Sequence, residues 1–81
     1  MYQYYIFIVM KTQDGEYSHD VKWAWDADKT AALNKAESLY YSCLSAAAVS
    51  TYAMHSVTLI SDKGEYMMSR CFNHPPIPEE V

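Results

Sequence analysis

The opening stretch of the chain, residues 2–10, consists almost entirely of aromatic and β-branched residues. Such residues favour a buried, pleated strand. Both alternating faces of this stretch are apolar, because Ile6 and Ile8 lie on one face while Phe7 and Val9 lie on the other. A strand of this kind needs cover on both faces, so we predict that residues 2–12 form the central strand of a sheet.

A turn and a second strand, residues 16–25, follow the first. Asp14-Gly15 is a strong hairpin signal, and large residues then alternate with small or polar ones. A two-residue turn places Ile8 opposite Val21 and gathers the large apolar residues of the second strand on one face, which we predict to be the core. The opposite face then carries Tyr5, Phe7, Val9, Lys11, Asp20 and Lys22. A three-residue loop would turn the second strand over and reverse this assignment.

A helix is predicted next, because apolar residues recur at helical spacing. The apolar stripe comprises Leu33, Ala36, Tyr40, Cys43, Leu44 and Ala47, and Ala32, Leu39 and Ala46 widen it. Asp26 or Asp28 is predicted to cap the helix, because a short carboxylate accepts hydrogen bonds from free backbone N–H groups. We expect the helix to end near Ala48, where Val49 and its neighbours lower helical propensity.

Two further strands are predicted over residues 54–61 and 65–72, on either side of a turn at residues 62–64. Gly64 suits the left-handed backbone that such a turn requires. A three-residue loop places Val57, Leu59, Met67 and Cys71 on one face of this hairpin. Ile60, Tyr66, Met68, Arg70 and Phe72 then fall on the other face.

These elements predict an α+β fold in the order ββαββ, formed by residues 1–73 and followed by an extended, proline-rich tail over residues 74–81. A right-handed crossover gives an antiparallel four-stranded sheet in the order 2-1-3-4, with the helix on one face. One helix is about 10 Å wide and covers roughly two strands spaced ~4.8 Å apart. The uncovered face is therefore predicted to be the interface of a homo-oligomer. Its residues are Tyr5, Phe7, Val9, Ile60, Tyr66, Met68 and Phe72.

Composition limits the function classes. The chain has 81 residues, 51% of them hydrophobic, and a net charge of −4, which indicates one small folded domain. The negative charge argues against a duplex nucleic-acid partner, because such proteins need clustered cations. The start of the chain has no basic segment of the kind that opens a signal peptide, and its apolar run of about ten residues is too short to span a membrane. We predict a cytoplasmic protein that binds no membrane and whose thiols, Cys43 and Cys71, are reduced and buried, with a Cys43–Cys71 disulfide as the alternative.

Motifs for catalysis or metal binding are weak. Cys71 and His74 have C-x-x-H spacing, but a structural zinc site usually shows a second close pair of ligands. Cys43 lies in the middle of the apolar stripe, which is typical of an inert thiol. The sequence contains no nucleophile elbow, no HExxH and no glycine-rich phosphate loop. We therefore predict a protein that is not an enzyme and that holds neither a cofactor nor a metal.

Aromatic and basic residues interleave on the predicted uncovered face. Rings stack on bases, and lysine or arginine pairs with phosphate, so this pattern suits a small nucleotide held between subunits. The candidate phosphate contacts are Lys11, Lys22, Arg70 and His74, and the candidate stacking residues are Tyr5, Tyr66 and Phe72. Alternatively, the rings form the centre of a subunit interface and the cations form its rim.

Residues 4–9, the Asp14-Gly15 turn, an alanine- and tyrosine-rich helix that starts at aspartate, and residues 57–64 together carry a resemblance. Over about residues 4–70, the chain resembles small uncharacterised proteins of phages and prophages of Gram-positive gut bacteria. The resemblance transfers no functional residue. It implies a phage accessory protein that counters host defence in the host cytoplasm.

Two modes of action follow from this resemblance. In the first, a homo-oligomer sequesters a cyclic nucleotide or ADP-ribose-type signal. In the second, the protein inhibits a host defence protein by binding it, as anti-CRISPR proteins do. A structural or assembly role in the virion is a third alternative.

Overall fold

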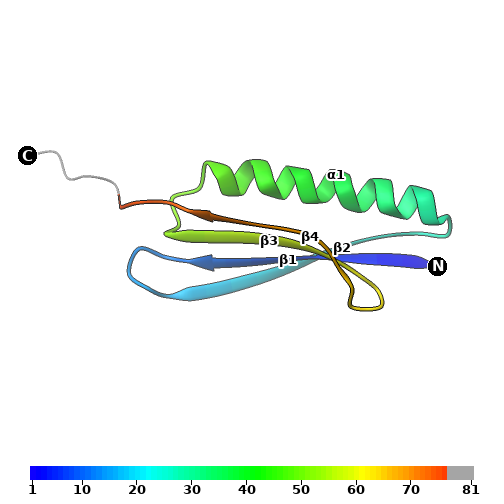
Figure 1. Cartoon of the computed structure of the whole chain (residues 1–81), viewed down its shortest axis with the longest axis horizontal. Coiled ribbons are helices and arrows are strands. Elements are labelled where there is room, and N and C mark those ends of the chain that lie inside the picture. The colour runs from blue at the N-terminus through cyan, green and yellow to red at the C-terminus, as the bar shows by residue number, and fades with distance from the viewer. Residues whose placement is uncertain (77–81) are drawn as a thin grey trace, which may run out of the picture.

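Four strands and one helix make up the computed structural model, which describes residues 1–76. The elements are β1 (Tyr2–Lys11), β2 (Tyr17–Asp26), α1 (Lys29–Ala48), β3 (Met54–Ser61) and β4 (Tyr66–Asn73). The strands form one antiparallel sheet in the order β2-β1-β3-β4, and α1 lies along one face of it (Figure 1). The predicted fold class and strand order are confirmed. Of the predicted tail, residues 77–81 lie outside the described residues.

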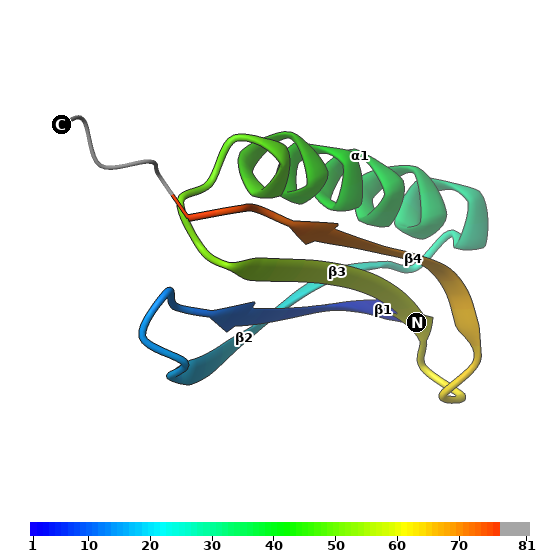
Figure 2. The same cartoon turned by 60° about the vertical axis from the view of Figure 1, so that its left-hand side comes forward.

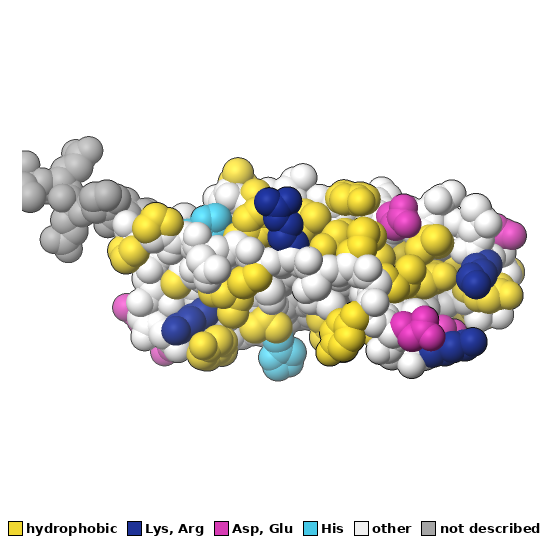
Figure 3. Space-filling view, in the orientation of Figure 1, with side chains coloured by type: hydrophobic (Ala, Val, Ile, Leu, Met, Phe, Trp, Pro, Cys, Tyr) yellow, Lys and Arg dark blue, Asp and Glu magenta, His cyan; other side chains and the backbone are white. Residues whose placement is uncertain are grey.

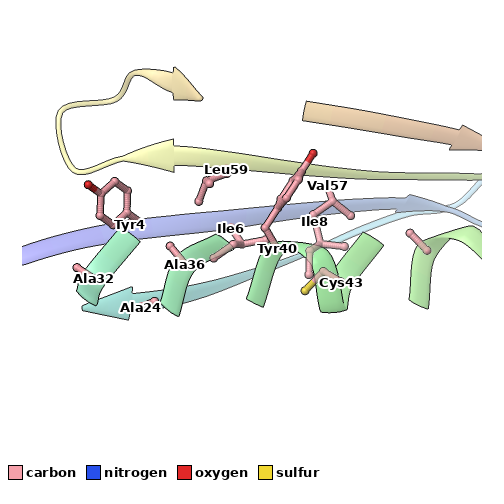
Figure 4. Close-up of a cluster of buried hydrophobic side chains, with 11 residues drawn as sticks. Tyr4, Ile6, Ile8, Ala24, Ala32, Ala36, Tyr40, Cys43, Val57 and Leu59 are labelled. Carbon is pink, nitrogen blue, oxygen red and sulfur yellow. The ribbon is translucent and has the colours of Figure 1, made fainter. Parts of the chain in front are cut away.

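The core lies between α1 and the sheet (Figure 4). The strands contribute large side chains, and Ile6, Val57 and Leu59 are completely buried. The helix contributes mostly small side chains, among them Ala32 and Ala36, which let it approach the sheet closely. Burial of each large aliphatic side chain contributes roughly 1.5–3 kcal/mol to the stability of this layer.

Both ends of α1 are held by specific hydrogen bonds. Asp28 caps the N-terminus, and its carboxylate accepts the N–H of Ala31 at 2.8 Å. Asp26 lies one step earlier and accepts the N–H of Asp28 at 3.0 Å and the ammonium of Lys35 at 2.7 Å. The backbone N–H of Asp28, with help from Lys35, holds the pKa of Asp26 below its usual value. The prediction of an aspartate cap is confirmed, and Asp28 is that cap.

The first hairpin differs from its prediction. Thr12 donates its N–H to the carbonyl of Glu16 at 2.8 Å, and Gly15 donates its N–H to Thr12 at 3.0 Å, so the loop contains three residues, 13–15. A two-residue type I′ turn requires positive φ at both central positions. Within residues 1–76 positive φ occurs at glycines alone, and Gly15 adopts +90°. The chain therefore closes with one more loop residue than predicted.

This longer loop turns β2 over. Ile8 pairs with Asp20 instead of Val21, so the predicted register is wrong by one residue. Asp20 and Lys22 consequently lie on the helix side of the sheet, and Ala24 is the buried residue of β2. The large residues of β2 therefore lie on the uncovered face, together with Tyr5, Phe7, Val9 and Lys11 of β1.

The second hairpin has the predicted three-residue loop, but a bulge follows it. Ile60 pairs with Tyr66 whereas Leu59 pairs with Met68, so Met67 is an extra residue in β4. Beyond the bulge the two faces of β4 exchange. Met68 and Phe72 pack against the core and Arg70 shares their face, so their predicted place on the uncovered face is wrong. Cys71 lies on the uncovered face and is exposed, which also differs from the prediction of a buried thiol.

The second face of the sheet carries no other element of the described chain (Figure 2). This agrees with the prediction that one helix leaves a face of the four-stranded sheet uncovered. None of the helical structure within residues 1–76 combines the length and apolar content needed to cross a membrane.

Candidate functional site: the open face of the sheet

We use "open face" for the side of the sheet that α1 does not cover. Because Ile6 and Ile8 point toward α1, the odd-numbered residues of β1 and β2 point away from it. On β2 these residues are Tyr17, His19, Val21, Trp23 and Trp25. In Figure 3, hydrophobic side chains reach the surface along the sheet as well as beside the helix.

One row of large residues crosses all four strands of the open face. Trp23 pairs with Tyr5, Tyr5 with Ile60, and Ile60 with Tyr66. The exposed fraction is 57% for Trp23 and 79% for Tyr66, whereas Tyr5 and Ile60 between them are half-buried. The Cβ atoms of residues paired directly across strands lie about 4.5–5.5 Å apart, so this row forms a continuous aromatic and apolar band.

The band continues on both sides. Trp25, beyond the row on β2, is 53% exposed, and Phe7 on β1 is 40% exposed. A shallow depression runs from Tyr5 and Phe7 past Ile60 to Tyr66 and the loop of the second hairpin. The apolar end of the open face therefore presents both wide rings and a hollow beside them.

The opposite end of the open face is more polar. The hydroxyls of Thr58 and Ser69 are hydrogen bonded at 2.9 Å, and Cys71 lies one row farther along. The ammonium of Lys11 lies 5.4 Å from the centre of the Tyr17 ring, which is a cation–π contact. The open face thus changes from aromatic to polar along the strands.

The predicted nucleotide contacts are divided between the two faces. Lys11, Tyr5 and Tyr66 lie on the open face, as predicted. The turned strand β2 carries Lys22 to the helix side instead, where it lines a groove beside α1.

The bulge in β4 moves two more of the predicted contacts. Arg70 and Phe72 lie on the helix side, with the guanidinium of Arg70 4.9 Å from the ring of Phe72. His74 stacks on Phe72 and donates its Nε2–H to the carbonyl of Ala47 at 2.8 Å. One protomer therefore does not gather the predicted phosphate contacts into one pocket.

The predicted interface residues are also divided. Tyr5, Phe7, Val9 and Ile60 lie on the open face. Met68 and Phe72 are packed against the core and belong to the helix side. The sequence interpretation did not include Trp23, Trp25 and Tyr17 in this surface, although the three-residue alternative for the first turn would have placed them there.

A second groove lies on the helix side, between α1 and β2. Ile8 and Met10 line it together with Asp20, Lys22, Ser42, Cys43, Ala46 and His55. Burial raises the pKa of the Cys43 thiol, which keeps it protonated and unreactive. His55 is hydrogen bonded to the hydroxyl of Ser50 at 3.0 Å, and within residues 1–76 no hydrogen bond joins it to Cys43. The groove therefore lacks an activated nucleophile.

Metal-binding geometry is likewise absent from the part of the chain that the structure describes, where no three His, Cys, Asp or Glu side chains gather. Cys71 and His74, the C-x-x-H pair, point to opposite sides of the sheet. Both cysteines are free thiols.

Comparisons with protein-family models, with curated proteins and with solved structures find no match to this chain. Its function therefore has to be inferred from its own residues. Most of the exposed aromatic residues gather on the open face, which makes this face the candidate site.

Proposed function

We propose that this protein acts without catalysis, as a binding protein that self-associates through the open face of its sheet. The observation that carries the proposal is the row Trp23–Tyr5–Ile60–Tyr66, with exposed rings at both ends. A continuous apolar patch of this kind usually marks an association surface. Tryptophan and tyrosine are also the residues that most often dominate the energy of such contacts.

A second copy of the chain is the partner we propose for this surface. Two sheets pack face to face at about 10 Å, with side chains from both inner faces between them. Each large aromatic side chain buries roughly 150–250 Å² in such a contact. A domain of this size also buries a comparatively small fraction of its own surface, so cover from a second copy would stabilise it.

Binding rather than turnover is supported by the state of the thiol and the imidazole that line the groove beside α1. Cys43 is buried and has a raised pKa, and His55 is held by Ser50 within the fold. The resemblance to phage accessory proteins, which stays a prediction, is consistent with a protein that acts by binding. Capture from host lysate tests whether the assembled protein also binds a host defence protein.

Nucleotide sequestration also stays a prediction. Among its candidate cations, Lys11 shares the open face with Tyr5 and Tyr66, whereas Lys22 and Arg70 lie on the helix side. Calorimetry against cyclic nucleotides and ADP-ribose derivatives tests it separately. If none of these ligands releases or absorbs heat on mixing, the nucleotide hypothesis fails while the self-association proposal is unaffected.

Light scattering coupled to size exclusion tests the proposal directly. We expect the protein to elute at a multiple of the 9.3 kDa chain mass. Tyr66→Ser and Phe7→Ser should each weaken self-association about tenfold or more, because each removes a ring from the open face. Tyr41→Ser is the matched control, because Tyr41 is also exposed but lies on α1.

The proposal is overturned by a wild-type protein that stays at 9.3 kDa up to about 100 μM, a concentration that corresponds to an association free energy near −5.5 kcal/mol. Equal effects of Tyr66→Ser and Tyr41→Ser would also contradict it. In that case the surface that associates is not the open face.

A further inference from the structure

The free edge of β2 is the starting point. In an antiparallel pair, residues alternate between those that hydrogen bond to the partner strand and those that point away from it. Thr12 donates its N–H to the carbonyl of Glu16, which fixes the even-numbered residues of β2 as bonded to β1. The odd-numbered residues, Tyr17 to Trp25, therefore direct their N–H and C=O groups outward. Consistently, the N–H of Val21 is accepted by the carboxylate of Asp20, its own neighbour, at 2.9 Å, a bond that pairing with another strand would exchange for one to that strand.

The two edges of the sheet differ in how well they are protected against pairing. The β4 edge has a bulge at Met67, and bulges are a common device that keeps an edge from accepting another strand. The β2 edge pairs with β1 in one unbroken register over its ten residues and contains no proline. A long, regular edge with unpaired N–H and C=O groups is a surface for strand addition.

Among the registers centred on residues 20, 21 and 22, the charges at the middle of β2 favour one for a second copy. Two β2 edges related by a two-fold axis must match outward-pointing residues with outward-pointing residues. Centred on Val21, the pairing sets Asp20 of each copy opposite Lys22 of the other. Shifted by one step either way, it sets Asp20 opposite Asp20 or Lys22 opposite Lys22, and like charges directly opposite are destabilising.

The same register matches the open face. Trp25 of each copy lies opposite Tyr17 of the other, and Trp23 lies opposite His19. The charged pairs fall at non-hydrogen-bonded positions, where side chains approach most closely. Asp20 and Lys22 are exposed at the rim of the groove beside α1, so both are accessible to a second copy.

We infer that β2 pairs with β2 of a second copy, antiparallel and centred on Val21, to form one eight-stranded sheet. This inference rests on the proposed self-association and adds a second contact to it. Edge pairing joins two open faces side by side, and face packing then joins two such sheets. The complete assembly is a tetramer with two kinds of two-fold contact.

Charge reversal and charge exchange test the edge contact. Asp20→Lys and Lys22→Asp each replace two attractive pairs by two repulsive ones, and we expect each to weaken edge pairing about tenfold or more. The double variant Asp20→Lys/Lys22→Asp restores opposite charges and should return the affinity to within about threefold of wild type. Glu65→Lys at the other edge of the sheet is the control. Sedimentation measures the assembly, and circular dichroism checks that each variant folds.

The outcomes separate this inference from the proposed function. With both correct, the single reversals leave a face-packed dimer, whereas Phe7→Ser leaves an edge-paired dimer. Edge pairing is contradicted if neither single charge reversal weakens association. It is also contradicted if the double variant does not restore the affinity that the single reversals lose. Either result leaves the open-face proposal unaffected. A wild-type protein that stays a monomer overturns both.

Discussion

At the scale of single residues, His55 shows how the fold uses a polar side chain inside its core. Its exposed fraction is 8%, and its Nδ1 is hydrogen bonded to the hydroxyl of Ser50. The ring of Tyr52 packs edge-on against the imidazole, with 5.5 Å between the ring centres. Burial, and secondly the nearby His74, lowers the pKa of His55 from its ordinary value of 6.5. The folded protein therefore holds this imidazole in its neutral form.

This lowered pKa predicts a pH dependence. Above pH 6.5 His55 is neutral in both states, so its contribution to the free energy of unfolding is fully present. As the pH falls below 6.5, the unfolded chain takes up the proton first, and stability is lost through the folded-state pKa. Urea unfolding measured from pH 7.5 to pH 5 checks this. His55→Gln is expected to lose less of its free energy of unfolding over this range than the wild-type protein. A loss of stability as large in His55→Gln as in wild type would contradict the assignment.

At the scale of elements, the two hairpin loops decide which face each edge strand shows. Gly15 has φ of +90° and Gly64 has φ of +80°, and both close three-residue loops. A side chain at such φ is strained even where space is available, as it is around Gly15. The register of β2, and with it the aromatic open face, therefore depends on a glycine at position 15.

Gly15→Ala should lower the free energy of unfolding by about 1 kcal/mol, because alanine is strained at positive φ. Asp14→Ala is the control, because Asp14 does not have positive φ. Chemical unfolding monitored by tryptophan fluorescence measures both variants. A Gly15→Ala protein as stable as Asp14→Ala would show that this turn does not hold the register.

At the scale of the whole molecule, the fold has one covered face and one uncovered face. Self-association stabilises a folded protein by mass action, so its melting temperature then depends on concentration. We expect the melting temperature to rise by roughly 3–5 °C for each tenfold increase in protein concentration. Tyr66→Ser should reduce this dependence and Tyr41→Ser should not. A melting temperature that is independent of concentration in the wild-type protein would argue against an obligate oligomer.

Most of the fold could be predicted from local patterns. The apolar run of β1, the helical spacing around Tyr40 and the cap at Asp28 are each encoded within a few neighbouring residues. The prediction of the open face was correct for β1 and for Ile60, because their alternation is independent of the loops. It was wrong for Lys22, and also for Met68, Arg70 and Phe72, because each of these lies beyond a loop or a bulge that changes the register.

The elements, their order and the fact that four strands are wider than one helix follow from residue type, spacing and chain length, so they can be predicted from the amino-acid sequence. The tertiary structure alone decided which residues the uncovered face shows. A single additional residue in a loop or a bulge reverses the two faces of a strand. Hairpin closure and core packing decided together that Ala24, and not Trp23 or Trp25, faces the helix.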